Sequence, residues 1–340
     1  MHSIVSWKSA AILAITLGAG IGAPATQATA QAPVVMKFGT TVAPGNPSTD
    51  AAFQFARIAG ERSNGRLKIE VYPSGQLGRG ENALMEGLLF GAVDIAVSGS
   101  APIGGIFEPA FQALDLPFLW ASRDQVGKVM DGPIGQELFK KLEAKGFKGL
   151  CFSGGWGFRH MMSNKRAVTM VDDMKGQTIR VQESPTYIGM MKALGANPVP
   201  MPFGELYLAM KQGTIDGMEL PPSSMVSEKF HEVTKYYSLT QHSYSPIGSY
   251  MSLKKYQAMP ADLQKAIDEA AKVACAFQRK DEVEKDIAGL DQMRKAGVQI
   301  NEVKNLQEFQ DRMGPVYQSV EAKVGKDFMG RLMAAVRAAR

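Results

Sequence analysis

Two arginines lie at positions where the chain could hold an anion. Arg159 lies in the segment GGWGFRHMMSN (154–164), just after the apolar run 149–152, and Arg180 lies near the end of a predicted strand over 178–181. An arginine offers two parallel N–H groups that match the geometry of a carboxylate. Binding residues in open α/β sheets gather at the carboxyl ends of strands, so both arginines are candidates for a carboxylate site. For each one alone, a surface charge or a structural salt bridge is the alternative.

The other reactive side chains form none of the common catalytic or metal-binding patterns. Histidine occurs at positions 2, 160, 231 and 242, and no His or Cys pair has zinc-ligand spacing. After residue 30 there is no Gly-x-Ser-x-Gly motif and no glycine-rich phosphate loop. We therefore expect no catalytic residue, no metal and no cofactor. An α/β protein without these patterns favours ligand capture over catalysis.

The N-terminal residues have the composition of a secretory signal peptide. Lys8 is the only Lys or Arg among the first thirty residues, an apolar stretch follows over 10–17, and small residues end at Ala30. A membrane anchor is the alternative, but roughly 14 apolar residues are too few to span a bilayer. We expect cleavage after Ala30 and a soluble, exported protein.

Composition limits the partners and the fold. The chain has 340 residues, more than one core usually serves, which favours two domains. Without Lys8 the 38 Lys and Arg become 37 against 33 Asp and Glu, and this surplus of four is scattered along the sequence. Scattered basic residues argue for small anionic ligands and against a nucleic-acid partner.

The two cysteines, Cys151 and Cys275, are 124 positions apart. Export would permit a disulfide. Because Cys151 lies in a predicted apolar strand and Cys275 on an alanine-rich helix, where buried thiols are common, we expect two free thiols, with the disulfide as the alternative.

The order of predicted elements indicates an α/β fold. Strands, helices and strands alternate through the first 152 residues, and a similar passage follows; the predicted strands are 34–39, 67–72, 93–97, 147–152, 178–181, 197–200, 215–219 and 298–303. Asn46 and Ser122 are expected to cap helices. Residues 261–288 contain no Gly or Pro and predict one helix of roughly 42 Å that could join two domains. Its small alanines argue against the alternative, a coiled coil.

Several motifs give the chain a resemblance to a known family. In chain order, they are YPSGQLG (72–78), EGLLFGAVDI (86–95), LPF (116–118), GFRH (157–160), DMKGQTIRV (173–181), GANPVPMPFGELY (195–207), GTIDGME (213–219) and FHEVTKY (230–236). Together they resemble the solute-binding proteins of tripartite ATP-independent periplasmic (TRAP) transporters, of the dicarboxylate-binding type. The resemblance covers nearly the whole chain after residue 30.

The resemblance implies a two-domain periplasmic-binding-protein (Venus flytrap) fold, with hinge strands and a long helix that spans both domains. We expect domain I to comprise 31–156 and 246–285, and domain II to comprise 157–245 and 286–340. The implied ligand is an organic carboxylate, and the implied partner is the membrane permease of a TRAP transporter.

The resemblance also implies site residues. Arg180 matches the arginine that pairs with the ligand carboxylate, and Arg159 matches a second anion contact. Phe203 matches an aromatic wall of the pocket, and Trp156 precedes Arg159 on a strand that faces the cleft. Core packing is the alternative for both aromatic residues.

The remaining expected ligand contacts are His242 at the pocket edge, Thr41 after the first strand, and Glu219 and Leu220 at the end of the GTIDGME motif. Many relatives carry a ligand-binding asparagine at position 220, and the sialic-acid-binding members carry acidic residues at 80 and 99, where this chain has glycine. Few polar groups would make a heavily hydroxylated sugar acid costly to bury. The expected ligand is therefore a smaller or partly apolar carboxylate: a four-carbon dicarboxylate, a hydroxy or keto acid, or an aromatic acid.

Two other functions are compatible with these residues. The protein could deliver its ligand signal to a sensor instead of a permease. It could also be an exported enzyme, for instance a lyase that uses Glu219 as a base.

Overall fold

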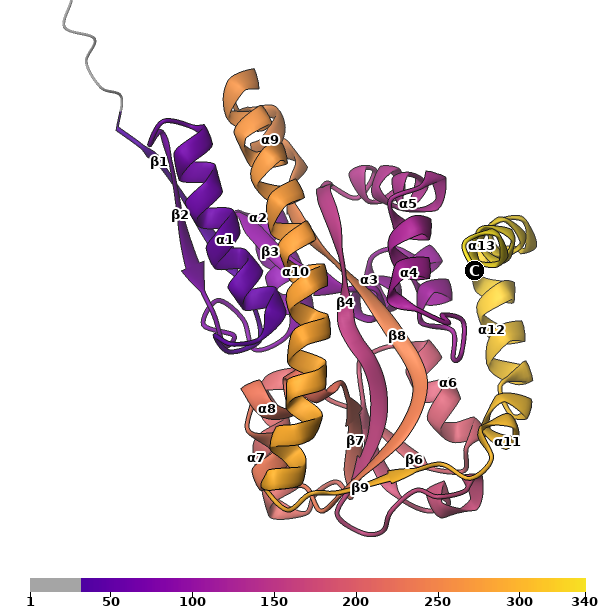
Figure 1. Ribbon diagram of the computed structural model, residues 1–340. Coiled ribbons are helices and arrows are strands. Elements are labelled where there is room, and N and C mark those ends of the chain that lie inside the picture. The colour runs from indigo at the N-terminus through magenta and orange to yellow at the C-terminus, as the bar shows by residue number, and fades with distance from the viewer. Residues whose placement is uncertain (1–31) are drawn as a thin grey trace, which may run out of the picture. The chain divides into compact units, whose positions relative to one another are not determined.

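A computed structural model describes residues 32–340 of the chain, and the predicted signal peptide lies outside the described residues. Pro33–Arg340 form one compact unit, built on a nine-stranded mixed sheet (Figure 1). None of the helices within 32–340 is both long enough and apolar enough to cross a membrane.

The sheet has the strand order β2-β1-β3-β8-β4-β7-β5-β6, and β9 pairs with β8. Neighbours are parallel within β2-β1-β3 and within β7-β5-β6, whereas β3-β8, β8-β4 and β4-β7 are antiparallel. The strands are β1 (Val34–Gly39), β2 (Leu67–Tyr72), β3 (Ile95–Gly99), β4 (Phe147–Ser163), β5 (Thr178–Val181), β6 (Asn197–Pro200), β7 (Gly217–Leu220), β8 (Tyr236–Ser252) and β9 (Gln299–Glu302).

Helices fill most of the connections between strands. The α-helices are α1 (Pro47–Arg62), α2 (Glu81–Phe90), α3 (Ser100–Ile106), α4 (Arg123–Met130), α5 (Pro133–Glu143), α6 (Pro185–Ala193), α7 (Leu206–Gln212), α8 (Pro222–Ser227), α9 (Leu253–Gln257), α10 (Ala261–Lys295), α11 (Leu306–Asp311), α12 (Gly314–Val324) and α13 (Lys326–Ala338). Short 3-10 helices cover Pro109–Asp115, Val171–Met174, Phe203–Glu205 and Phe230–Glu232.

Local signals in the sequence set many of these boundaries. The Asn46 side chain accepts the N–H of Ser48 at the start of α1, and the Ser122 hydroxyl accepts the N–H of Gln125 at the start of α4, as the predicted caps require. Gly91 ends α2 in the left-handed conformation that glycine tolerates. The predicted bounds of β1, β2, β5 and β6 are also confirmed.

The predicted strand 147–152 is too short, and β8 has no counterpart among the predicted strands. β4 continues to Ser163, and β8 pairs with it antiparallel along both of their lengths, with shifts in register. Three of the four residues 154–157 are glycine. In the structure these glycines permit close packing: a Cβ at Gly155 would lie 2.4 Å from the Tyr244 ring, and one at Gly157 would lie 2.6 Å from Pro221.

The paired strands β4 and β8 connect two groups of parallel strands. β3 pairs with β8 over Ile247–Met251, whereas β7 pairs with β4 over His160–Ser163. The predicted domain limits at 156/157 and 245/246 fall at one register shift, between Gly155 and Phe158. These limits stay a prediction, and we propose this shift as the hinge. The C-terminal helix α13, predicted in domain II, contacts α4 and α5, which were predicted in domain I.

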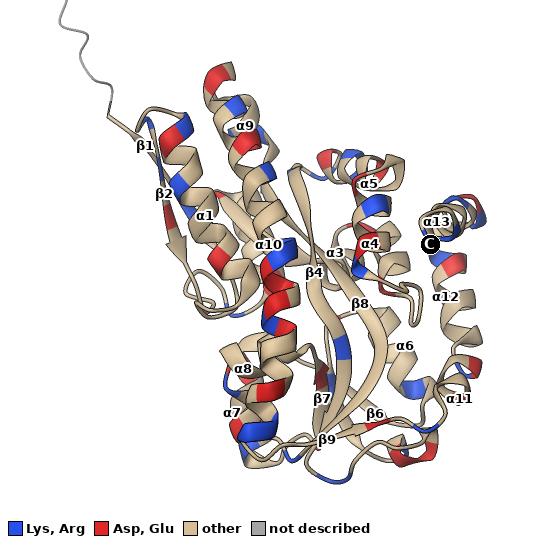
Figure 2. Cartoon of the chain, viewed as in Figure 1, with Lys and Arg blue, Asp and Glu red and all other residues tan. Residues whose placement is uncertain are grey.

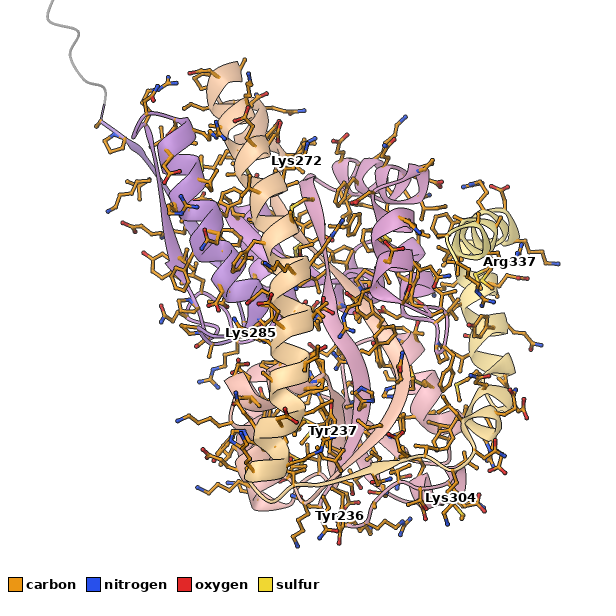
Figure 3. The ribbon with its side chains drawn as sticks, viewed as in Figure 1. Tyr236, Tyr237, Lys272, Lys285, Lys304 and Arg337 are labelled. Carbon is orange, nitrogen blue, oxygen red and sulfur yellow. A yellow bond between two sulfur atoms is a disulfide. The ribbon has the colours of Figure 1, made fainter. Side chains whose placement is uncertain are left out.

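The long helix α10 is longer than predicted. It covers 35 residues, roughly 52 Å, and continues through Gly289, where the sequence suggests a stop. It packs against α1, β4 and α8, so it reaches elements of both strand groups. In the C-terminal half of the helix, Lys285 (labelled in Figure 3) pairs with Asp50 of α1 at 2.5 Å.

Acidic and basic residues are interspersed along α10 (Figure 2). One of these acids, Glu282, contacts both of the paired strands β4 and β8. The buried Glu282 carboxylate accepts the hydroxyl of Tyr244 at 2.9 Å, the N–H of Gly155 at 3.3 Å and the Nε–H of Arg123 at 2.7 Å. These bonds join α10 to both β4 and β8 beside the register shift.

Gly289 gives a first testable prediction. Glycine normally costs a helix about 1 kcal/mol relative to alanine, but a Cβ at Gly289 would lie 2.7 Å from the backbone oxygen of Pro222 in α8. We expect Gly289→Ala to destabilise the protein by about 1–3 kcal/mol through overpacking. Gly330 in α13 is the matched control, because a Cβ there meets nothing within 4 Å, and Gly330→Ala is expected to stabilise slightly. Urea denaturation of the two variants measures both effects; equal shifts would contradict the packing argument.

The expectation of two free thiols is wrong. Cys151 of β4 and Cys275 of α10 form a disulfide, and no free cysteine occurs in the described residues. The packing of α10 on β4 brings their Cα atoms to 6.5 Å, within the range that a disulfide can bridge. The sequence could not reveal this pairing, because it depends on contacts between segments 124 residues apart.

Removing the disulfide gives a second prediction. A cross-link that closes a loop of this length restricts the unfolded chain, and we expect the double variant Cys151→Ala/Cys275→Ala to lose about 2–4 kcal/mol of stability. Denaturation with and without reductant is the measurement. Reductant should lower the midpoint of the wild type and leave the double variant unchanged, and an unaffected wild type would overturn the prediction.

Candidate functional site

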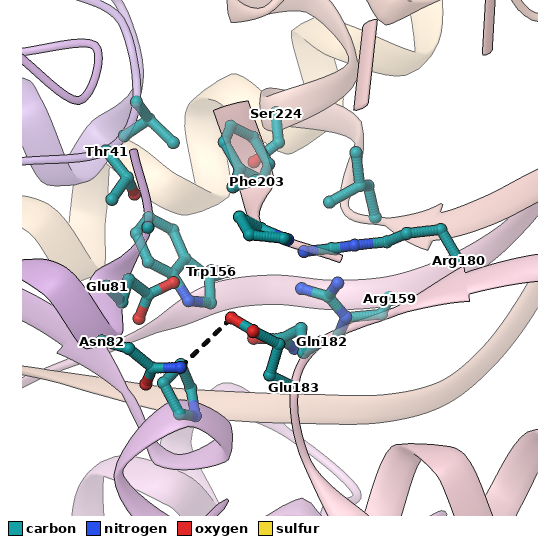
Figure 4. Close-up of a pocket in the computed structure, with 15 residues that line it drawn as sticks. Thr41, Glu81, Asn82, Trp156, Arg159, Arg180, Gln182, Glu183, Phe203 and Ser224 are labelled. Atoms are coloured by element: carbon teal, nitrogen blue, oxygen red, sulfur yellow. Dashed lines mark hydrogen bonds between the residues drawn. The ribbon is translucent and has the colours of Figure 1, made fainter. Parts of the chain in front are cut away.

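A pocket lies at the carboxyl ends of the parallel strands, beside the paired strands β4 and β8 (Figure 4). It has an empty volume of about 520 Å³, part of it open to solvent, which suits a small molecule. Its walls come from both strand groups and from β4. The lining residues are Thr41, Val42, Gly80, Glu81, Asn82, Pro102, Trp156, Arg159, Arg180, Gln182, Glu183, Pro202, Phe203, Leu220 and Ser224.

Six of the eight predicted site residues line this pocket: Thr41, Trp156, Arg159, Arg180, Phe203 and Leu220. Glu219 and His242 do not, and both are buried behind it. The Glu219 carboxylate instead contacts Arg159 and lies close to His242.

Arg159 forms a buried ion pair with Glu219. Its Nε donates to Glu219 Oε2, and its Nη2 donates to Glu219 Oε1 at 2.9 Å and to the Glu219 backbone oxygen at 2.6 Å. His242 Nε2 lies 3.7 Å from Glu219 Oε2. Burial raises the pKa of the Glu219 carboxyl, but the guanidinium of Arg159 reverses this and leaves the pKa below its usual value. Glu219 therefore neutralises and orients Arg159.

Arg180 has no acidic partner within 32–340. Its Nε and Nη2 both donate to the backbone oxygen of Met201, at 2.9 and 2.7 Å, and its Nη1 has no partner among the described residues. Burial lowers the pKa of Arg180 to about 10, and the nearby Arg159 contributes to this shift. A desolvated guanidinium with one open edge is prepared to bind an anion.

Trp156 and Phe203 supply aromatic surface in the pocket, from β4 and from the segment after β6. Phe203 also packs edge-on against Phe230, with ring centroids 5.8 Å apart. It therefore both lines the pocket and packs against a core residue, the two roles that the sequence alone leaves as alternatives. The indole Nε1 of Trp156 lies close to Gly99, where a Cβ would approach it to 3.0 Å. Glycine at 99 therefore makes room for the indole.

The pocket is more polar than the sequence indicated. Glu81, Asn82, Gln182 and Glu183 all line it, and none was predicted. Gln182 and Glu183 follow Arg180 at the carboxyl end of β5, which is a signal that could have identified them. Glu81 begins α2 directly after Gly80. This chain therefore carries an acidic residue one position after position 80, where the sialic-acid-binding members of the family carry one.

The two sides of the pocket touch each other. Asn82 Nδ2 of α2 donates to Glu183 Oε2 at 3.1 Å (Figure 4), and the N–H of Gly204 donates to the backbone oxygen of Arg79 at 3.2 Å. Both bonds join the segment around the start of α2 to segments of the other strand group. Within 32–340, no group of three or more His, Cys, Asp or Glu side chains is arranged to hold a metal ion.

Two groups of parallel strands, connected by two long strands and lining one pocket from both sides, define the architecture of a solute-binding protein. Comparisons with known proteins identify the family. The family described as bacterial extracellular solute-binding protein, family 7 (DctP), matches residues 38–323. The chain is 34% identical over 280 residues to the 2,3-diketo-L-gulonate-binding periplasmic protein YiaO of Escherichia coli, covering 82% of this chain and 84% of that protein.

Two further proteins agree. The chain is 32% identical over 327 residues to the C4-dicarboxylate-binding periplasmic protein DctP of Rhodobacter capsulatus, covering 94% and 97% of the two chains. The crystal structure of the sugar acid binding protein DctPAm from Advenella mimigardefordensis, in complex with galactonate, superposes with a TM-score of 0.88 at 32% identity, covering 91% of this chain and 99% of that one. The chain belongs to this family of solute-binding proteins of TRAP transporters and has its two-domain α/β fold.

Proposed function

We propose that this protein binds an organic carboxylate in the pocket and delivers it to the membrane permease of a TRAP transporter. The observation that carries this proposal is Arg180, a buried guanidinium with no acidic partner in the described chain and one open edge. The ligand carboxylate would accept from Arg180, and the oriented Arg159 would supply a second contact.

Export to the periplasm through the signal peptide at 1–30 is part of the proposal. The family consists of extracellular solute-binding proteins, which supports it. Domain closure about the register shift in β4 and β8 would enclose the ligand, and the contacts between Asn82 and Glu183 and between Gly204 and Arg79 correspond to a closed pocket.

Glu219 does not support an enzymatic role as a base. Both of its carboxylate oxygens accept N–H groups of Arg159, and its side chain does not line the pocket. No feature of the described residues favours a sensor over a permease as the recipient.

A thermal-shift screen against an organic-acid library tests the proposed function, because a ligand of the native state raises its apparent melting temperature by mass action. We expect at least one carboxylate to raise the melting temperature and calorimetry to measure one site per chain. Neutral analogues of that ligand, such as its amide or alcohol, serve as controls and should not bind. A library without any binding carboxylate would contradict the proposal.

A further inference from the structure

Three polar atoms on the pocket wall have no partner among residues 32–340. Asn82 Oδ1 and Gln182 Nε2 are buried and make no hydrogen bond. The Glu81 carboxylate accepts the N–H of Gly99 at 2.5 Å and the hydroxyl of Ser98 at 3.2 Å, both through Oε2, and its Oε1 has no donor. Unpaired buried polar atoms are costly, so a bound molecule that pairs them gains affinity and selectivity.

The charges around the pocket fit a single anionic group in the ligand. Glu219 neutralises Arg159, which leaves Arg180 as a cation without an acidic partner in the described chain. Glu81 is a carboxylate in the same pocket that forms no ion pair within 32–340; burial raises the pKa of its carboxyl, and the nearby charges of Arg180 and Arg159 partly offset this effect. Glu183 adds a second acid at the exposed rim. A second carboxylate of a ligand would meet Glu81 without a further cation, and like charges in a desolvated site repel each other.

The unpaired atoms also distinguish between neutral and cationic donors. Glu81 Oε1 and Asn82 Oδ1 need donors, whereas Gln182 Nε2 needs an acceptor. An ammonium group can only donate, but a hydroxyl both donates and accepts. The orientation of the Asn82 amide is fixed, because its Nδ2 donates to Glu183. Hydroxyl groups therefore satisfy all three atoms.

We infer that the ligand is a monocarboxylate with several hydroxyl groups, such as an aldonate, and that Glu81, Asn82 and Gln182 bind those hydroxyls. This inference rests on the proposed function, since it assigns the carboxylate to Arg180. It differs from the expectation of a smaller or partly apolar acid, which rested on Gly80, Gly99 and Leu220 and did not include the neighbouring Glu81.

The environment of Glu81 supports this assignment. Burial raises the pKa of its carboxyl, and the bonds from Gly99 and Ser98 only partly offset the effect. Hydroxyl donors from a ligand would stabilise the charged form. Figure 4 shows Glu81 beside Trp156. Both side chains border Gly99, because a Cβ placed on Gly99 would lie 3.0 Å from Trp156 Nε1 and 3.4 Å from Glu81 Oε2. The indole N–H thus adds a donor near the same carboxylate.

Calorimetry with ligands of matched length tests the inference on the wild-type protein. The four-carbon set is erythronate, succinate and butyrate, and the six-carbon set is galactonate, adipate and hexanoate. We expect the aldonate of at least one set to bind about tenfold or more tightly than both other members, because the acids without hydroxyls leave the polar atoms unpaired. If the tightest ligand of the whole organic-acid library carries a second carboxylate or no hydroxyl, the inference is overturned while the proposed function stands. If no carboxylate binds, the proposed function itself fails.

The variant Glu81→Gln separates recognition from a structural role. It keeps the shape and an oxygen for Gly99 and Ser98 but removes the charge. We expect weaker aldonate binding and stronger dicarboxylate binding, so that the ratio of the two affinities falls about tenfold or more. Equal losses for both ligands, or an unchanged ratio, would contradict the inference.

Two further variants complete the test. Glu86→Gln, on the exposed face of the same helix, is the matched control and should change neither affinity. Gln182→Leu should weaken aldonate binding and leave the binding of the unsubstituted acid unchanged, which provides an independent result if Glu81→Gln does not fold. A loss of both affinities in Gln182→Leu would count against a hydroxyl contact.

Discussion

Replacing Arg180 with alanine is expected to lower the affinity for the carboxylate ligand by about 2–5 kcal/mol, the cost of truncating one partner of a buried, hydrogen-bonded charge pair. Arg180 is 3% exposed and lacks an acidic partner within 32–340, so the ligand would be its counter-charge. Isothermal titration calorimetry of wild type and variant with the same ligand is the measurement.

Two controls make the Arg180 result specific. Arg180→Lys keeps a charge but loses the planar fork, and we expect it to recover only part of the lost affinity. Arg57→Ala removes an exposed arginine of α1 that pairs only with neighbouring residues of the same helix, and it should bind like the wild type. Unchanged binding in Arg180→Ala would show that the carboxylate lies elsewhere.

The variant Glu219→Gln is expected to destabilise the unliganded protein by about 3–5 kcal/mol, because it leaves the buried Arg159 without its counter-charge. Arg159 is 2% exposed and Glu219 is fully buried, so water cannot replace the lost interaction. Chemical denaturation without ligand measures this effect. In the same variant Arg159 carries an uncompensated charge, so the anionic ligand should recover a larger share of the stability than it gives the wild type.

The double variant Arg159→Met/Glu219→Met is the control for the ion pair. Apolar side chains of similar size can replace a buried pair at little cost, whereas breaking it by removing one partner is costly. We therefore expect the double variant to be more stable than Glu219→Gln when both are free of ligand. A double variant that loses as much stability as Glu219→Gln would indicate that the pair is not the source of the effect.

The structure changes how the two arginines are understood. Their positions near predicted strand ends make them similar candidates, and only the family resemblance ranks Arg180 above Arg159. In the structure Arg159 lies within the long strand β4 and is neutralised by Glu219, whereas Arg180 ends a short parallel strand and keeps an open edge. The difference depends on β7, which pairs with both β4 and β5 and so positions Glu219 beside Arg159.

Local sequence signals and the family resemblance were sufficient to predict several short elements, the family and six of the residues that line the pocket. The bounds of β1, β2 and α2 follow from alternating apolar residues, caps and turn glycines, which are local signals. Arg180 could be predicted for a related reason: it lies near the carboxyl end of a parallel strand, and these ends converge in an α/β sheet. Thr41 was predicted from the family resemblance.

Features that depend on contacts between distant segments could not be predicted from the sequence. The pairing of β4 with β8, the Cys151–Cys275 disulfide and the continuation of α10 past Gly289 each require contacts between residues far apart in the chain. The unpaired atoms of Glu81, Asn82 and Gln182 belong to the same group, because whether a polar atom has a partner depends on everything packed around it. Local sequence patterns carry no record of those neighbours. For that reason the sequence alone predicts a carboxylate site, whereas the inference about the hydroxyl groups of the ligand needed the packed structure.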